Sequence, residues 1–461
     1  MPLRLPPTLM ASVSGFRGRV GEALTPELVA GLAAAFGAFA ASRGHGDTVC
    51  LGRDSRTSGP MLARAVAAGL QSVGCRVIDL GVVPTPTLLL SVGHHGAAGG
   101  VAVTASHNPA EWNALKLSSH EGMFLDDETS ARFRAALAES DPPRAPWDRL
   151  GGVEADDGAV RRHLDAILAL PHLDLERIRA RALRVALDCV HGAGGVIMPD
   201  LLEALGCRVD AIGTETDGRF PRDPEPTADH LGDLSRLVKE SGADVGLAVD
   251  PDVDRLSLVD ERGEPLGEDL TLALAAAAVL ERRPGPVVTN LSTSRVVEDV
   301  AAAAGVPLVR APVGEIHVAR RMQREGAVVG GEGNGGVILP ALHHTRDAPL
   351  AAALVLQHLA DAGAPLSEVA GRWPRYVIVK EKLAFPREAL PDAYAALEED
   401  LDGDEVDRTD GLRLAWTKRR AWLHVRPSGT EPVVRLIAEA PGEEEARALL
   451  RRASARLEGI A

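Results

Sequence analysis

The chain has 461 residues, of which 45% are hydrophobic and 25% are charged, so it can form several globular domains but is too long for a single core. Its formal net charge is −15, which argues against nucleic acid or an anionic membrane as the main partner, because both bind basic surfaces. No apolar run approaches the ~18 residues of a membrane span, and no apolar signal segment opens the chain, so a cytoplasmic protein is expected.

A pattern of strand, polar loop, helix, glycine and second strand recurs three times. The copies run from Val49 to Leu80, from Arg184 to Val209 and from Pro286 to Arg310. A glycine after the helix is typical of a C-cap, and strand–helix–strand units pair their strands in parallel through a crossover. The repetition therefore predicts three similar α/β domains with mixed, mainly parallel sheets.

Composition divides the chain further. Residues 140–157 are rich in Pro, Asp and Gly, an acidic loop ends near Arg255, and residues 373–382 lead into a shorter tail. The tail has two strand-like runs and a helix-like end, Glu443 to Leu457, so an α+β domain is expected there. The expected domains are residues 1–150, 151–255, 256–370 and 371–461.

The first candidate site follows the strand-like run Val101 to Val103. The next residues are Thr104-Ala105-Ser106-His107-Asn108-Pro109. A serine on a loop just past a strand end is well placed to act as a nucleophile, and proline there ends regular structure. An ordinary turn is the alternative, because Ser, Asn and Pro all favour turns. A serine hydrolase is disfavoured, since no G-x-S-x-G motif surrounds Ser106.

Lys116 follows this loop in an apolar segment. Only five of the 50 basic residues in the chain are lysines. Burial can lower the pKa of a lysine until it exchanges protons near neutral pH, whereas arginine stays charged. Lys116 is therefore a candidate general acid/base, and a surface lysine is the alternative.

Three carboxylates alternate after a buried strand, in Asp250-Pro251-Asp252-Val253-Asp254-Arg255. They repel one another unless a cation intervenes, and an all-oxygen set favours Mg²⁺ over Zn²⁺. An EF-hand is disfavoured, because Arg255 stands where its loop needs glycine. A solvated acidic turn is the other alternative.

A glycine-rich segment, Gly330-Gly331-Glu332-Gly333-Asn334-Gly335-Gly336, follows another strand-like run. Its glycines allow a ligand to approach the backbone closely, and Glu332 and Asn334 could bind sugar hydroxyls. It is a weak dinucleotide motif, since no helix start or suitable acidic residue follows. A flexible loop is the alternative.

The last candidate, Arg426-Pro427-Ser428-Gly429-Thr430-Glu431-Pro432, lies between two strand-like runs, with Arg435 just beyond. Guanidinium groups, hydroxyls and the free N–H groups of a turn can together bind a phosphate. A simple β-turn is the alternative, and no Walker A motif is present.

Taken together and in this order, the motifs resemble those of the α-D-phosphohexomutase family over nearly the whole chain. The resemblance implies four domains around a central cleft, the first three of shared topology. Residues 104–109 resemble the family's phosphoserine loop, 250–255 its metal loop, 331–336 its sugar-binding loop and 426–430 its phosphate-binding loop. Ser14-Gly15-Phe16-Arg17-Gly18 is similar to its N-terminal element, which places Arg17 near the active site.

The resemblance also implies a mechanism and a site. Ser106 carries a phosphoryl group, Asp250, Asp252 and Asp254 hold one Mg²⁺ beside it, with Ser106 as the fourth residue of the metal site, and Lys116 is the general acid/base. A hexose 1,6-bisphosphate forms, turns end for end and returns its other phosphate to Ser106. The remaining implied catalytic residues are Arg17 and His107, and the implied substrate-binding residues are Arg255, Glu332, Asn334, Arg426, Ser428, Gly429, Thr430 and Arg435.

One departure concerns the sugar-binding loop. Many family members have Ser and His where this chain has Asn334 and Gly336, so a histidine acid/base is absent there, and His343 or His344 is a candidate replacement. The expected partner is a hexose phosphate and the expected state a monomer or homodimer. Phosphoglucosamine mutase activity is favoured, with phosphomannomutase/phosphoglucomutase as the alternative. A non-catalytic sugar-phosphate-binding protein and a phosphatase are hypotheses from other classes.

Overall fold

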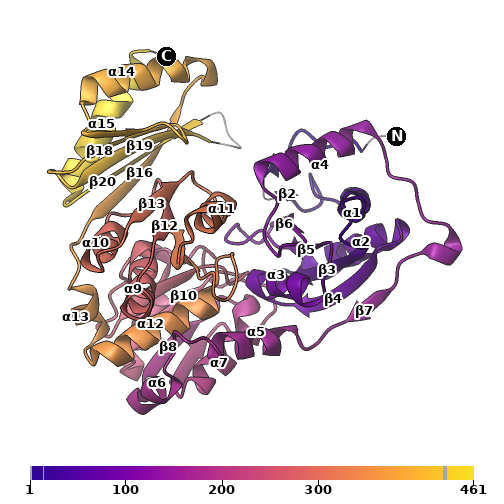
Figure 1. Cartoon of the computed structure of the whole chain (residues 1–461), viewed down its shortest axis with the longest axis horizontal. Coiled ribbons are helices and arrows are strands. Elements are labelled where there is room, and N and C mark those ends of the chain that lie inside the picture. Colours follow the sequence, from indigo (N-terminus) through magenta and orange to yellow (C-terminus); the bar gives the residue numbers. More distant parts are fainter. Residues whose placement is uncertain (1–2, 14, 429–432, 461) are drawn as a thin grey trace.

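The computed structural model describes residues 3–13, 15–428 and 433–460. Its strands form four sheets that follow one another along the chain, each packed against helices of its own (Figure 1). None of the helices within the described residues is both long and apolar enough to cross a membrane.

The first sheet has the order β1-β2-β6-β5-β3-β4-β7. Its strands are β1 Met10–Ser12, β2 Gly15–Arg19, β3 Thr48–Arg53, β4 Arg76–Val82, β5 Gly99–Val103, β6 Trp112–Ser119 and β7 Val153–Ala155. Its helices are α1 Pro26–Ser42, α2 Gly59–Ser72, α3 Thr85–His94 and α4 Asp127–Glu139. Strands β3, β4, β5 and β7 are parallel, whereas β6, β2 and β1 extend the sheet through antiparallel pairs.

The second and third sheets have four strands each, in the orders β11-β10-β8-β9 and β13-β12-β14-β15. The second domain consists of β8 Arg184–Asp188, β9 Arg208–Ile212, β10 Val245–Val249, β11 Leu256–Asp260, α5 Ala159–Leu168, α6 Leu175–Arg181, α7 Met198–Ala204 and α8 Gly232–Ser241. The third consists of β12 Val287–Asn290, β13 Leu308–Ala311, β14 Val329–Glu332, β15 Gly336–Ile338, α9 Glu268–Arg282, α10 Val296–Ala303, α11 Glu315–Glu325, α12 Ala348–Ala362 and α13 Leu366–Ala370.

The three sheets share one arrangement, as the sequence repetition predicts. In each, a first strand lies between a second and a third that are parallel to it, and a fourth pairs antiparallel with the third. The fourth strand follows the third through a short loop, residues 104–111, 250–255 and 333–335. The three loops that resemble the family's phosphoserine, metal and sugar-binding loops therefore occupy the same position in the three repeats.

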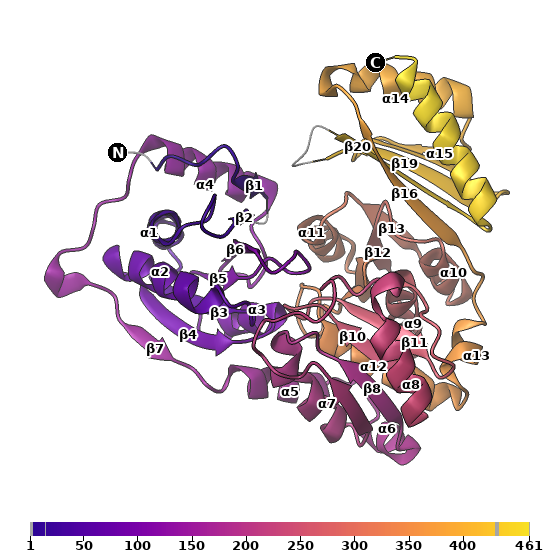
Figure 2. The same cartoon turned by 180° about the vertical axis from the view of Figure 1, so that it is seen from behind.

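The C-terminal domain is α+β. Its antiparallel sheet has the order β16-β20-β19-β18-β17, and two helices pack on one face of it (Figure 2). Its elements are β16 Val377–Ala384, α14 Leu390–Leu401, β17 Glu405–Asp407, β18 Leu412–Trp416, β19 Ala421–Pro427, β20 Val433–Ala440 and α15 Glu443–Glu458. The phosphate-binding-like motif begins with Arg426 and Pro427, the last two residues of β19.

Strand pairing moves two of the expected domain boundaries. Strand β7 pairs with β4, so the first sheet extends beyond residue 150. Strand β11 pairs with β10 and belongs to the second sheet, so a division at residue 255 would separate two hydrogen-bonded strands. We therefore propose divisions after residue 155 and between residues 260 and 268. Strand β7 pairs with a strand that is distant in sequence, and β11 pairs with β10 across the acidic loop. Composition alone does not reveal either pairing.

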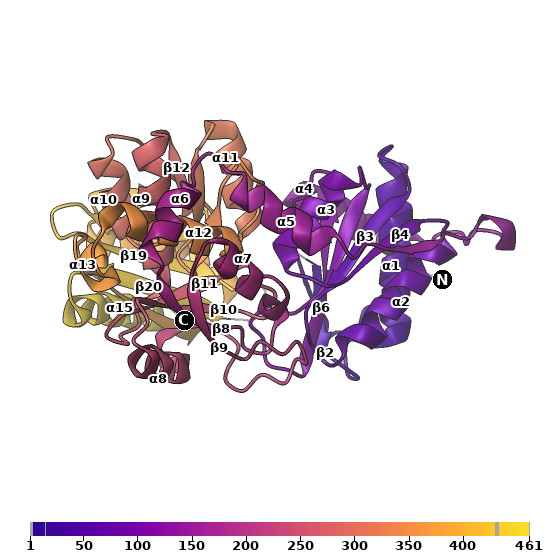
Figure 3. The same cartoon turned by 90° about the horizontal axis from the view of Figure 1, so that it is seen from below.

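The second and third domains share one hydrophobic core, whereas the first and fourth have their own. Helices α9 and α12 are alanine-rich and buried along most of their length, as expected for helices that are apolar on all sides. They pack against each other, and α12 also contacts α5, α6 and α7 (Figure 3). This shared core holds the loops after β10 and β14 in a fixed relation.

Candidate active site

The loop that carries Ser106 is held by a buried arginine, Arg56. Its Nη2 donates to the carbonyl oxygens of Ser106 and Asn108, both at 2.6 Å, and its Nη1 donates to that of Pro109 at 2.7 Å. Asp54 accepts from Arg56 Nε at 3.0 Å and from Thr104 Oγ1 at 2.6 Å. With both ionic partners fully buried, this network fixes the backbone of the loop.

Ser106 adopts a strained conformation in the loop that follows β5. Its φ of 50° lies in the left-handed region, which non-glycine residues seldom occupy. Its backbone N–H donates to Thr104 Oγ1 at 2.9 Å, and its Oγ donates to Asp250 Oδ2 at 2.7 Å. In this strained conformation the Ser106 hydroxyl points toward the acidic loop of the second domain.

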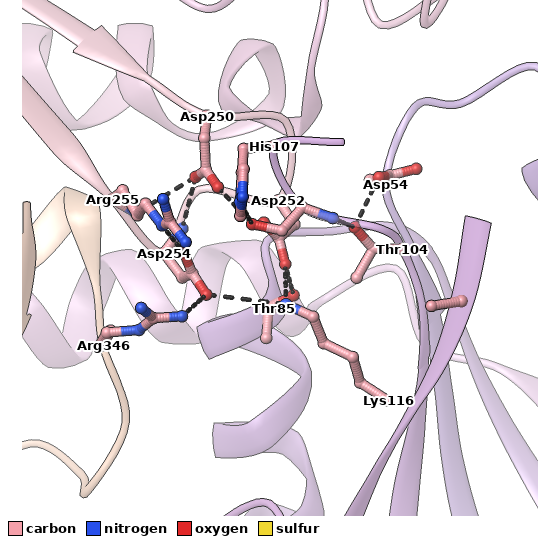
Figure 4. A network of polar contacts seen from close by, with 12 residues as sticks. Asp54, Thr85, Thr104, His107, Lys116, Asp250, Asp252, Asp254, Arg255 and Arg346 are labelled. Carbon is pink, nitrogen blue, oxygen red and sulfur yellow. Dashed lines mark hydrogen bonds and ion pairs between the residues drawn. The ribbon is translucent and has the colours of Figure 1, made fainter. Parts of the chain in front are cut away.

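The three aspartates of that loop are fully buried and their carboxylates point toward one another (Figure 4). One oxygen from each lies within 4.8 Å of the others, and the intervening Val253 has a φ of 62°. Burial, together with repulsion from Asp254 and Asp252, raises the pKa of Asp250. Among the described residues, Asp252 Oδ1 and Asp254 Oδ1 have no hydrogen-bond donor, so the cluster has unfilled ligand atoms.

Lys116, on β6, lies opposite the triad. It is 7% exposed, and its Nζ is 2.7 Å from Asp252 Oδ2 and 3.7 Å from Asp254 Oδ2. Burial works to lower the pKa of Lys116, but the attraction of these two carboxylates outweighs it and the pKa is raised. The net pKa of Lys116 is therefore raised rather than lowered, because carboxylates from a loop 136 residues away pair with it.

The glycine-rich segment places Glu332 at the end of β14. Glu332 Oε1 accepts from Asn290 Nδ2 at 2.8 Å and from the Gly314 N–H at 3.0 Å, and Oε2 accepts from Arg346 Nη1 at 2.9 Å. Although burial acts to raise the pKa of Glu332, attraction by Arg346 and these donors lowers it. Glu332 is therefore an ionised, fixed acceptor, suited to sugar hydroxyls.

In the fourth domain, Arg426 and Arg435 face each other across β19 and β20. Arg426 Nε is 2.9 Å from Asp410 Oδ2, and Ser428 is buried, with its N–H donating to the Val433 carbonyl at 2.9 Å. The two arginines form a basic wall that can bind a phosphate. Gly429 and Thr430, also expected to bind phosphate, lie outside the described residues.

A cleft of about 1010 Å³ brings most of these groups together, whereas the buried triad aspartates and Ser428 are not among the residues that line it. Side chains from all four domains line it, and Arg17, whose Nη1 donates to Asn108 Oδ1 at 2.7 Å, lies beside His107 at its wall. Repulsion from Arg255, then burial, lowers the pKa of His107. The expected site residues that line the cleft are Arg17, Ser106, His107, Lys116, Arg255, Glu332, Asn334, Arg426 and Arg435.

Models of the four phosphoglucomutase/phosphomannomutase domains match the chain, with the three alpha/beta/alpha domains at residues 10–144, 161–263 and 267–376 and the C-terminal domain at 376–455. The chain belongs to the α-D-phosphohexomutase family. It is 40% identical over 440 residues to a probable phosphoglucosamine mutase of Methanopyrus kandleri and 38% identical over 441 to a phosphoglucomutase/phosphomannomutase of Thermococcus kodakarensis, with 95% of both chains covered each time.

The fold of this phosphohexomutase also matches a solved structure. A phosphoglucomutase/phosphomannomutase family protein from Burkholderia thailandensis superimposes with a TM-score of 0.84 at 27% identity, and the match covers 98% of this chain and 99% of that one. The expected fold class, three α/β domains and an α+β domain, is therefore confirmed. By family the protein is an isomerase that moves a phosphoryl group within a sugar phosphate.

The donor set of the phosphohexomutase fits a hard divalent cation. All three convergent ligands are carboxylates, and two of their buried oxygens have no hydrogen-bond donor among the described residues. Without a cation, Lys116 and Arg346 offset the charge of the triad, from opposite sides in Figure 4. The residues present can therefore hold a hard divalent cation, with Ser106 Oγ beside them.

Neither candidate replacement for the missing histidine reaches the cleft of the phosphohexomutase. His343 Nε2 is hydrogen-bonded to Asp347 Oδ2 at 2.7 Å, as is His163 Nε2 at 2.7 Å, and His344 is half-buried outside the cleft lining. Asp347 also caps α12 by accepting from the Leu350 N–H. We call His163, His343 and Asp347 the histidine joint, since it links α5 to the start of α12.

Sequence reasoning missed three residues of the site. Arg56, Arg346 and Thr85, whose Oγ1 donates to Asp252 Oδ2 at 2.7 Å, all contact active loops that are distant in sequence. Two of them are buried arginines, and burial of so large a charged side chain is itself unusual. Only the sequence Arg53-Asp54-Ser55-Arg56, which begins at the last residue of β3, gave a local signal, a polar loop at a strand end.

Proposed function

We propose that the enzyme interconverts hexose 6-phosphates and hexose 1-phosphates through a phosphorylated Ser106 and a hexose 1,6-bisphosphate. The observation that carries this proposal is the contact of 2.7 Å between Ser106 Oγ and Asp250 Oδ2, within a buried carboxylate triad that Lys116 faces from the other side. Family membership supports the reaction class, and the roles of individual residues belong to the proposal.

Each transfer exchanges one P–O bond for another. The bond from phosphorus to Ser106 Oγ breaks while a bond to a sugar hydroxyl oxygen forms, and the hydroxyl proton must reach the serine oxygen. The protonated Lys116 can give a proton to the leaving oxygen and regain one from the attacking hydroxyl. Bound Mg²⁺ would supply charge neutralisation at the phosphoryl oxygens.

The second half of the cycle needs the same groups in reverse. The bisphosphate must turn over, and the cleft of about 1010 Å³ has room for such reorientation. In both orientations Arg426 and Arg435 would bind the phosphate that is not transferred, while Glu332 would accept from sugar hydroxyls. A site that recognises either end of the bisphosphate also distinguishes a mutase from a phosphatase, which needs no second phosphate site.

For the sugar, we propose phosphoglucosamine mutase activity first. Relatives at 40% and 35% identity carry that name, and Glu268 offers support from the cleft. It lines the cleft, and its Oε1 is buried without a hydrogen bond among the described residues. An ammonium group on the sugar could pair with it. Phosphoglucomutase/phosphomannomutase is the second candidate, because a relative at 38% identity has that name.

Turnover of the 1-phosphates of glucosamine, mannose and glucose, with Mg²⁺ and a trace of glucose 1,6-bisphosphate, tests this proposal. Isomer formation supports a mutase, inorganic phosphate indicates a phosphatase, and no product with tight binding indicates a sugar-phosphate sensor. We expect the highest kcat/KM for glucosamine 1-phosphate. A cytoplasmic location and a monomeric or dimeric state stay predictions.

A further inference from the structure

Gly336, the first residue of β15, stands where a side chain would enter the cleft wall. A β-carbon on Gly336 would lie 2.2 Å from Cδ and 2.8 Å from Cγ of Arg346. The backbone of Gly336 does not lie in the region with positive φ that favours glycine. Glycine is therefore required here by space alone, and the space is taken by the stem of Arg346.

Arg346 cannot easily move aside, because three carboxylates hold its guanidinium group. Its Nη2 donates to Asp254 Oδ2 at 2.6 Å, its Nη1 to Glu332 Oε2 at 2.9 Å and its Nε to Glu315 Oε2 at 3.1 Å. The side chain is 9% exposed and lines the cleft. These partners belong to the acidic loop of the second domain and to the third domain, so one planar group joins the triad to the sugar loop.

We propose that Arg346 is a positioning residue that couples the acidic triad to the sugar-binding carboxylate, and that Gly336 serves to admit it. The inference rests on the proposed function. Asp254 and Glu332 are each hydrogen-bonded to the same guanidinium group, through two different nitrogens. An arginine suits this position because its fork reaches two carboxylates at fixed angles, which a lysine does not.

The bridge makes the two binding events interdependent. A divalent cation bound to the triad would neutralise part of the charge of Asp254, so Arg346 would bind Glu332 more firmly and fix that carboxylate for sugar hydroxyls. Each ligand should therefore raise the affinity for the other by the same factor. Arg346 also opposes cation binding by its own charge, so its removal has opposite effects on the two ligands.

Calorimetry on four proteins tests the proposal, all in a Ser106→Ala background that prevents phosphoryl transfer. They are the background itself, Arg346→Met, Arg346→Lys and Arg222→Met. Arg222 is a matched control, since its Nε pairs with Asp188 Oδ2 at 2.7 Å and it lies outside the cleft lining with a similarly small exposed fraction. Mg²⁺ and glucose 1-phosphate are titrated singly and together.

In the background protein we expect Mg²⁺ to tighten glucose 1-phosphate binding by about 5-fold or more. With Arg346→Met, Mg²⁺ should bind as tightly as before or more tightly, the sugar phosphate about 10-fold more weakly, and the coupling should disappear. Arg346→Lys should give an intermediate factor, and Arg222→Met the background values. A coupling factor that survives in Arg346→Met, or parallel loss of both affinities, overturns the proposal.

Gly336→Ala supplies a second test that needs no arginine substitution. It should displace Arg346 and reproduce the loss of coupling, whereas adding it to Arg346→Ala should have a much smaller effect, since only Asn334 Oδ1, 3.1 Å from the added carbon, then remains close. Independent, additive effects would contradict the role given to Gly336. If the background protein binds no glucose 1-phosphate at all, the proposed function fails and this inference with it; if it binds with coupling that ignores Arg346, only the inference fails.

Discussion

The acidic triad and the histidine joint are two buried clusters that could hold a metal ion in the part of the chain that the structure describes. In the joint, Asp347 accepts from two imidazoles and a backbone N–H, and His163 Nδ1 is hydrogen-bonded to Thr87 Oγ1 at 2.8 Å. In the triad, three carboxylates share the cationic side chains of Lys116, Arg346 and Arg255, and two oxygens have no hydrogen-bond donor among the described residues.

This difference separates a cluster that stabilises the fold from one that is suited to bind a ligand. A buried carboxylate whose lone pairs are filled contributes to stability, whereas like charges with unfilled lone pairs cost stability until a cation binds. The joint links α3, α5 and the start of α12, one from each of the first three domains. The triad instead comes from a single loop and contacts Ser106 and Lys116, which line the cleft. Substitutions should therefore have opposite signatures in the two clusters.

The largest expected effect is on turnover in the triad. Asp250→Asn should lower kcat/KM by about 10³-fold, because it removes a metal ligand and charge beside the transferred phosphoryl group. Its melting temperature without Mg²⁺ should equal or exceed that of the wild type, since burial and repulsion raise the pKa of Asp250 and its charge is unfavourable there. Coupled assays and calorimetric scans in EDTA measure both, and a marked loss of metal-free stability would contradict this assignment.

In the joint the signature should be reversed. Asp347→Asn should lower the free energy of unfolding by about 2 to 4 kcal/mol, because hydrogen bonds to an ionised buried carboxylate are lost. Its kcat, measured well below its melting temperature, should stay within about 3-fold of the wild type. Urea unfolding and initial rates give the two values, and a large loss of kcat with intact stability would place the joint in the chemistry.

Mg²⁺ should distinguish the clusters by ligand stabilisation. At about 100 times its dissociation constant, Mg²⁺ should stabilise the wild type by about 2.7 kcal/mol. The gain should persist in Asp347→Asn and vanish in Asp250→Asn. Thermal scans with and without Mg²⁺ make this comparison, and an undiminished shift in Asp250→Asn would show that the ion binds elsewhere.

Acid should weaken the joint through His343. Burial lowers the pKa of His343 in the folded protein. In the unfolded chain the pKa of a histidine is about 6.5, so the unfolded chain binds the proton more readily than the folded protein does. A group with a lowered folded pKa contributes stability above its unfolded pKa and loses it as pH falls. Stability should thus decline from about pH 6.5 downward, by roughly 1 kcal/mol per pH unit from this group, and less steeply in His343→Gln. The free energy of unfolding is measured by urea denaturation at several pH values. If it falls equally steeply with pH in the wild type and in His343→Gln, His343 is not the source of the acid sensitivity.

The smallest expected effect concerns sugar preference. Glu268→Gln should lower kcat/KM for glucosamine phosphate about 5-fold relative to glucose phosphate, because a partly exposed ion pair with the ammonium group is lost. Glu381→Gln is the control, since it neutralises another carboxylate that lines the cleft, and it should leave the ratio of the two substrates unchanged. Equal losses on both sugars in Glu268→Gln would remove Glu268 from substrate discrimination.

The fold could be predicted, and the four motifs could be recognised as candidates, because their signals are local. Strand–loop–helix repeats and contiguous runs such as residues 104–109 and 250–255 are visible without tertiary contacts. The raised pKa of Lys116, the pairing of β11 with β10 and the bridge made by Arg346 could not, because each depends on partners that only folding brings together. At Gly336 the sequence indicated only that the histidine of many family members is absent. Arg346, whose side chain fills the space beside Gly336, lies ten residues further on and could not be connected with it from the sequence.

The central claim is that the triad binds a divalent cation against Ser106. Anomalous diffraction from crystals soaked in Mn²⁺, with the Asp250→Asn protein as control, tests it most directly. We predict one strong peak within bonding distance of Asp250, Asp252 and Asp254 and next to Ser106 Oγ, greatly reduced in the control. A peak at the histidine joint with none at the triad would contradict the account.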